Sequence, residues 1–394
     1  MAISTPQRSF SAQVWQQFRR SITHLGALAV IGLIVLLAIY APLISSSQPL
    51  LWCTPTEGCS SPWLKGLFFN RNVFDNGIDL FFNLLIFFLP LTLLAHLSLS
   101  KWGASEKKAA YKKRLNLTLF TLLMGLFFAL IVWQPRYYVP DYLLLESEAH
   151  RAWFTPLRMQ YGDVLFGAEG PGLCHFLGLD TSGRDVFVRM LFGARVSLAV
   201  GVIAVGIYMI IGVVMGSLAG FYGGWVDLFT ERTVEIFLCF PALFLILTFI
   251  SFLDRPSIVW VMVFIGVVGW TGPARLVRGE FLRLRSQDFV VAARALGLSD
   301  TRIVFRHILP NALGPVLVAA TFGIANAVIV EATLSFLGIG DPVLPSWGRI
   351  LALGRATGDN GMMLLAGALI FVTVSALNMA GEGLRDALDP RMRQ

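Results

Sequence analysis

Charged residues are scarce in this chain of 394 residues: Asp, Glu, Lys and Arg make up 14% of it, whereas 56% is hydrophobic. Soluble domains carry about 25% charged residues. The composition therefore excludes a soluble globular protein and predicts an integral membrane protein. The formal net charge of +7 is typical of basic cytoplasmic loops in membrane proteins, so it does not indicate nucleic-acid binding.

The motifs of common enzyme classes are absent as well. The chain contains no Gly-Lys pair and hence no GxxxxGK[ST] loop to hold the phosphates of a nucleotide. It has no GxSxG or HExxH motif, and its five histidines are scattered singly. We therefore predict that the chain is not an enzyme, binds no metal or cofactor of its own and does not hydrolyse ATP.

Cysteine is rare, with four residues and no CxxC pair. Cys53 and Cys59 are six residues apart in a segment rich in Pro, Gly and Ser. They are close enough to form a disulfide if this segment faces an oxidising compartment. The sequence leaves open whether they are bonded or are two unrelated thiols.

Long apolar runs, in contrast, are abundant. A bilayer core of about 30 Å needs about 20 helical residues. Eight runs of about this length occur, at residues 25–44, 80–99, 115–133, 196–219, 233–252, 258–276, 312–337 and 362–380. We expect each to be a transmembrane helix, with a cytoplasmic turn at residues 221–232. The predicted fold class is all-α, a polytopic helical bundle of about eight transmembrane helices.

Basic residues orient these spans. Arg19 and Arg20 precede the first span, and the loop between the second and third spans holds six basic residues against one acid. Both segments are therefore expected in the cytoplasm. An even number of crossings returns the C-terminal tail, which contains Arg385, to the same side.

Residues 288–310, with the sequence DFVVAARALGLSDTRIVFRHILP, interrupt the apolar chain on the cytoplasmic side. Asp288 is expected to cap a short helix that ends at Gly297 in left-handed geometry. Ser299 is expected to cap a second short helix, and Pro310 either stops it or begins the next span. The pattern predicts two short helices joined at a glycine.

The order of residues in this stretch resembles the EAA loop of the membrane subunits of bacterial ABC importers. The matching residues are Ala292, Ala293, Gly297, Leu309 and Pro310, while Val291 replaces the glutamate of the motif. The resemblance implies that the loop, which includes His307, docks into a cleft on an ATPase subunit. It also implies a set of residues that pack within the cleft, with candidates Phe289, Ala293, Leu296, Ile303 and Phe305. The alternative is an ordinary basic cytoplasmic loop.

From about residue 175 to its end, the chain resembles the second, C-type membrane subunit of the dipeptide/oligopeptide/nickel class of ABC importers. The resemblance is carried by ordered stretches that include GLDTSGRD (178–185), GARVSL (193–198), AGFYGGWVD (219–227), ARLVRGE (274–280), EATLSFLG (331–338) and PSWG (345–348). Residues 10–45 resemble the N-terminus of the same family.

This resemblance implies a core of the type I ABC-importer kind, with the first span in residues 1–45 and five spans plus the coupling loop in residues 175–394. Residues 46–174 depart from the family, because they insert a hairpin of two spans whose role the sequence does not identify. The implied function is that of a permease subunit of an ATP-driven importer in the bacterial cytoplasmic (inner) membrane, with both termini in the cytoplasm. Peptides are the expected substrate, and nickel complexes or other solutes stay open.

The implied partners are a homologous permease subunit, two ATPase subunits that bind ATP and Mg²⁺, and an extracytoplasmic substrate-binding protein. Glu331 and Asn326 lie within the seventh span and are candidates for the pathway or its gate, because polar groups at this depth should face protein or water. Two other functions remain open: a secondary transporter that uses Glu331 as its ion site, and a scaffold that transports nothing. Neither accounts for the Ala-Ala/Gly/Leu-Pro spacing.

Overall fold

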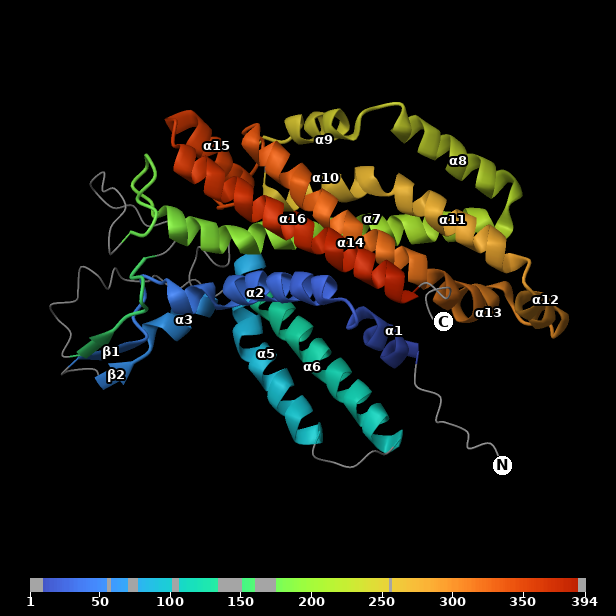
Figure 1. Cartoon of the computed structure of the whole chain (residues 1–394), viewed down its shortest axis with the longest axis horizontal. Coiled ribbons are helices and arrows are strands. Elements are labelled where there is room, and N and C mark those ends of the chain that lie inside the picture. The colour runs from blue at the N-terminus through green and yellow to red at the C-terminus, as the bar shows by residue number, and fades with distance from the viewer. Residues whose placement is uncertain are drawn as a thin grey trace. The chain divides into compact units, whose positions relative to one another are not determined.

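The structure of the chain is a computed structural model (Figure 1), which describes residues 10–54, 58–69, 77–100, 106–133, 151–159, 175–254 and 257–388. It divides into two compact units, one of residues 1–34 with 197–394 and the other of residues 35–196. Helices dominate both units, as the all-α prediction requires. The main departure from that class is a small sheet of three strands.

The unit of residues 35–196 begins in the second half of α2 (Ile22–Ile44) and ends in the first part of α7 (Val186–Tyr222). Its sheet has the order β2-β1-β3, and both pairings are antiparallel. The remaining elements are β1 (Leu51–Thr54), β2 (Gly58–Ser60), α3 (Pro62–Phe69), α5 (Gly77–Ser100), α6 (Glu106–Trp133) and β3 (Arg151–Trp153).

Helices α5 and α6 form the predicted hairpin. Leu80, Leu84 and Phe88 of α5 pack against Leu123 and Leu130 of α6. Helix α6 begins at Glu106, nine residues before the expected span, since the Lys- and Ala-rich stretch ahead of the apolar run also favours a helix. Lys101, which belongs to the predicted basic loop, lies outside the described residues.

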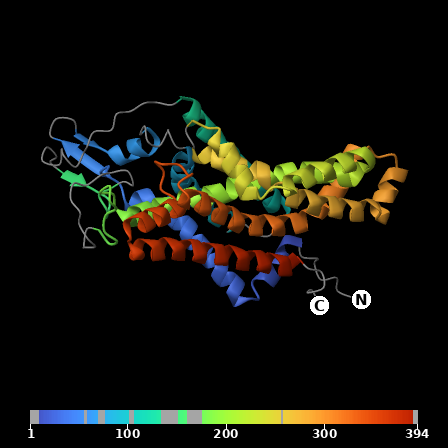
Figure 2. The ribbon, with the colours of Figure 1, turned by 90° about the horizontal axis from the view of Figure 1, so that it is seen from above.

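The other unit contains the rest of α2 and α7 and the C-terminal half of the chain. Helices α14 and α16 run side by side (Figure 2), and α15 packs against both. Gly216 brings α7 into backbone contact with α11, because a Cβ atom on it would lie 2.4 Å from the carbonyl oxygen of Ala274. The elements are α1 (Phe10–Phe18), α8 (Gly224–Leu238), α9 (Ala242–Ser251), α10 (Ile258–Gly269), α11 (Thr271–Arg285), α12 (Asp288–Ala295), α13 (Asp300–Ile303), the π-helical turn η2 (Val304–Ile308), α14 (Leu309–Phe336), α15 (Trp347–Thr357) and α16 (Asn360–Leu388).

Within the described ranges, six helices are long and apolar enough to cross a membrane, and two bent helix pairs raise the number to at most eight. The runs expected as spans at 233–252 and 258–276 fall in two bent helix pairs, since α8 and α9 meet at 82° and α10 and α11 at 41°. Pro241 separates α8 from α9, and a proline has no N–H with which to continue the helix. The count of eight holds if each bent pair crosses once.

The turn expected at residues 221–232 is much shorter in the structure than predicted. Helix α7 continues to Tyr222, and α8 begins at Gly224. The chain changes direction at Gly223 and Gly224, whose φ angles are 70° and 57°. Only glycine adopts such angles at little cost, so two residues suffice for the turn.

Candidate functional site

The segment of residues 288–308, formed by α12, α13 and η2, lies at the end of its unit away from α15 (Figure 1). Helix α12 begins after Gln287, so Asp288 occupies its first turn and is not the cap. There its carboxylate faces the positive end of the helix dipole. Gly297 has a φ of 75°, which confirms the left-handed residue that the sequence predicts after this helix.

At its end, the second piece of the segment follows one of the two predicted alternatives, in which Pro310 begins the next span. Ser299 occupies the N-cap position, as predicted, although its side chain makes no capping hydrogen bond. Helix α13 then continues through η2 directly into α14, and Pro310 lies in the first turn of that helix. The second helix therefore begins the next long helix instead of stopping.

The inner face of the 288–308 segment is part of a hydrophobic core. Val290, Ala293, Ile303 and Ile308 are buried there with residues of three long helices, namely Phe221 of α7, Val277, Phe281 and Leu284 of α11, and Ala312 and Val316 of α14. Ile303 is 0% exposed and Ala293 4%. The prediction that these two residues pack within a partner's cleft was therefore wrong, because the chain itself covers both side chains.

The outer face of the segment has large apolar side chains that are exposed. Phe289 is 40% exposed, Leu296 80% and Phe305 64%. Val291 of α12, which replaces the motif's glutamate, is 56% exposed as well. We call these four residues the outer apolar face. Of the other motif residues, Ala292 and Pro310 are exposed, whereas His307 and Leu309 are half-buried.

Ion pairs join α8 to α11 beside the segment, and a cation–π contact attaches the segment itself to α7. Arg278 of α11 donates from Nη2 to Oδ2 of Asp227 in α8 at 2.8 Å, and its Nη1 lies 2.9 Å from Oε1 of Glu231. Arg294 of α12 lies 5.2 Å from the ring centroid of Phe221. Sequence reasoning missed Asp227 and Arg278 as partners, although each lies in one of the family stretches, AGFYGGWVD and ARLVRGE.

Glu331 lies elsewhere in this unit, and its side chain is completely buried. It accepts hydrogen bonds from the hydroxyl of Ser335 at 2.7 Å and from that of Ser197 in α7 at 3.3 Å. It also hydrogen-bonds Ser346, the N-cap residue of α15. Glu331 thus connects α7, α14 and α15 through hydroxyl groups.

Asn326, the other candidate for the pathway, lies in a different environment. It is exposed and lines a cavity of about 370 Å³ between α7, α9, α10, α11 and α14. Tyr208, Ile246 and Phe322 line the same cavity, and Glu331 is not part of its wall. The two candidates are therefore not brought together.

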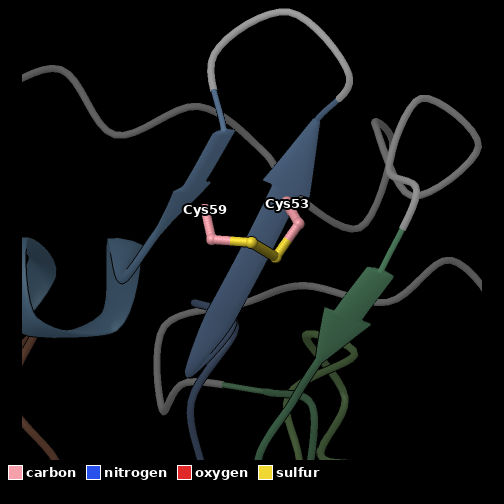
Figure 3. The surroundings of a disulfide bond; sticks show 2 residues. All are labelled: Cys53 and Cys59. Atoms are coloured by element: carbon pink, nitrogen blue, oxygen red, sulfur yellow. A yellow bond between two sulfur atoms is a disulfide. The ribbon is translucent and has the colours of Figure 1, made fainter.

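Cys53 and Cys59 face each other across the β1–β2 pair and form a disulfide (Figure 3). The structure thus has the bonded form of the two alternatives that the sequence leaves open. Within the ranges described above, no three His, Cys, Asp or Glu side chains are grouped to hold a metal ion.

Comparison with known proteins identifies the family of this chain. Residues 212–394 match the family model of the binding-protein-dependent transport system inner membrane component, and residues 9–51 match that of the N-terminal transmembrane domain of oligopeptide transport permease C. The dipeptide transport system permease protein of Alkalihalophilus pseudofirmus is 40% identical over 228 residues, which cover 57% of this chain and 75% of the relative. The chain belongs to this permease family.

A second curated relative and a solved structure are also similar to this chain. The oligopeptide transport system permease protein of Bacillus subtilis is 36% identical over 61% of this chain and 81% of the relative. A solved structure of the methionine ABC transporter in inward-facing conformations aligns with 52% of this chain and 96% of its own, with 22% identity and a TM-score of 0.44. The family models and the curated relatives make the chain a permease subunit of an ABC importer of the inner membrane, as the sequence predicts.

Proposed function

We propose that this permease forms a translocation pathway together with a homologous membrane subunit and that its outer apolar face docks into a cleft on an ATPase subunit. The observation that carries the proposal is the division of the 288–308 segment into a buried inner face and an exposed apolar outer face. Several large apolar side chains exposed within one short segment make it a candidate protein interaction site. The inner face joins the same segment to α11 and α14, which supports its role in carrying motion.

ATP and Mg²⁺ would bind to the two ATPase subunits, because the sequence of this chain has no phosphate-binding loop. Closure of the ATPases on ATP moves the 288–308 segment, and α11 and α14 follow since they share its core. The helices around the cavity at Asn326 then rock between inward-facing and outward-facing states. Asn326 is the polar group that we assign to the pathway.

We further propose peptides as the substrate, delivered by an extracytoplasmic binding protein. The names of the relatives support this class, since they include a dipeptide, an oligopeptide and a glutathione transport permease. The basic segments favour cytoplasmic termini. The Cys53–Cys59 disulfide favours an extracytoplasmic β-sheet, because disulfides persist in oxidising compartments.

The test is affinity purification of the tagged chain in mild detergent. We expect recovery of a second multi-span subunit and of ATPase subunits with phosphate-binding loops. The variant with both Leu296→Asp and Phe305→Asp should lose the ATPases and keep the second membrane subunit. Val343→Asp, which changes another exposed apolar residue (68% exposed) outside the segment, serves as the matched control. Retention of the ATPases by the double variant, or their absence from the unmodified complex, would overturn the proposal.

A further inference from the structure

The side chain of Arg195, near the start of α7, is completely buried. Its Nη1 donates to Oδ1 of Asp79 at 3.0 Å and to Oδ1 of Asn83 at 2.9 Å. Both acceptors belong to α5, the first helix of the inserted hairpin, and both are buried. A guanidinium group taken out of water is strongly destabilising unless it is paired and hydrogen-bonded. Helix α5 supplies this counter-charge.

The same guanidinium group also binds α2. Its Nε donates to the carbonyl oxygen of Ala38 at 2.6 Å and its Nη2 to that of Ile39 at 3.0 Å. Pro42 follows four residues after Ala38 within α2, and since proline has no N–H, the carbonyl of Ala38 lacks its usual i+4 donor. Arg195 provides the missing donor. Arginine suits this position because its five N–H donors form a planar fork.

Helix α3 completes the connection. The side-chain amide of Asn83 donates to the carbonyl oxygen of Leu67 in α3 at 3.0 Å. The indole of Trp63, also in α3, donates to the carbonyl oxygen of Pro42 at 2.9 Å. A continuous set of hydrogen bonds therefore passes from α7 through α5 and α3 to the interrupted turn of α2.

The hairpin lies between the two ranges of residues that the family models match. We propose that it is a built-in brace of this permease: Asp79 of α5 neutralises Arg195, and Arg195 in turn holds the proline-interrupted end of α2 to the start of α7. This role is independent of the proposed ATPase docking. In this role the inserted hairpin binds Arg195 of the same chain. A change at Asp79 should therefore weaken the contact between α2 and α7.

The experiment is a double-mutant cycle on the purified complex in detergent, read as the midpoint temperature of unfolding and the yield of monodisperse protein. Asp79→Asn and Arg195→Met should each lower the midpoint and the yield. The midpoint of the double variant should fall by clearly less than the sum of the two single decreases, because the double variant removes both buried charges together. Glu235→Gln is the control, since it removes an acid from an exposed pair with Arg232 and should leave the midpoint unchanged.

Two further variants keep the test decisive if Asp79→Asn does not fold. Asp79→Glu keeps the charge and should retain more folded protein than Asp79→Asn. Pro42→Ala restores an N–H to α2, so Arg195→Met should be less harmful in that background. Additive losses in the cycle, equal losses for Asp79→Glu and Asp79→Asn, or no benefit from Pro42→Ala would each overturn the brace.

Discussion

A Cβ atom on Gly323 of α14 would lie 1.5 Å from the hydroxyl oxygen of Tyr208 in α7. The aromatic side chain of one helix thus occupies the space that a side chain on the other would need. Tyr208 also lines the cavity at Asn326, so this contact forms part of the cavity wall.

We therefore expect Gly323→Ala to destabilise the permease by about 1–3 kcal/mol, the usual range for overpacking. Tyr208→Phe in the same chain should restore part of the loss, because it removes the nearest atom. Gly314→Ala is the matched control in α14, where an added Cβ meets nothing within 4 Å. Unfolding in detergent measures all three, and equal stability of the two alanine variants would contradict the close contact.

Gly297 allows a direct test of coupling. An added side chain there meets nothing within 4 Å, so a substitution acts through the backbone, whose φ is 75°. Left-handed geometry costs most L-residues about 1–2 kcal/mol, whereas Asn tolerates it. We expect Gly297→Val to change the angle between α12 and α13 and to uncouple ATP hydrolysis from uptake in proteoliposomes while the protein stays inserted.

Gly297→Asn is the control for that variant and should keep most of the uptake. Undiminished uptake by Gly297→Val would remove the coupling role. Equal loss by both variants would show that a side chain, and not the φ angle, causes the defect.

Ile303 and Leu296 separate stability from docking. Ile303→Ala opens a space in a hydrophobic core and should cost about 2–5 kcal/mol of stability. Leu296 is 80% exposed, so Leu296→Ala should change stability by no more than about 0.5 kcal/mol yet weaken ATPase binding. Unfolding midpoints and ATPase affinity, measured on the same preparations, check both statements. A large stability loss for Leu296→Ala would contradict this division of faces.

Glu331 is expected to act through hydrogen bonds. Glu331→Gln keeps groups that bond Ser335 and Ser197 and should retain uptake. Glu331→Ala removes the carboxylate acceptor of the buried O–H groups of Ser335 and Ser197, at a cost of about 1–3 kcal/mol for each donor left unsatisfied. Uptake and unfolding midpoints distinguish the two. Loss of uptake in Glu331→Gln at an unchanged midpoint would instead favour an ion-carrying role for this carboxyl group.

Several features of the permease could be predicted from the sequence because they depend on short stretches. The apolar runs match the length that a bilayer demands. The membrane spans of α5 and α6 lie where two of these runs predict them. Gly297 adopts left-handed geometry because glycine lacks a Cβ atom. Each of these outcomes is decided within a few turns of one helix.

Other features were decided only by tertiary packing. Ile303 and Ile308 both face the core although they are five residues apart, since the π-helical turn between them departs from the regular α-helical period. Arg195 meets Asp79, which lies 116 residues away, because α2, α5 and α7 pack together around the turn that Pro42 interrupts. The sequence alone determined the membrane class, the family and the left-handed geometry at Gly297. Which side chains face a partner and which neutralise a buried charge depends on contacts between distant helices, and local propensity carries no information about them.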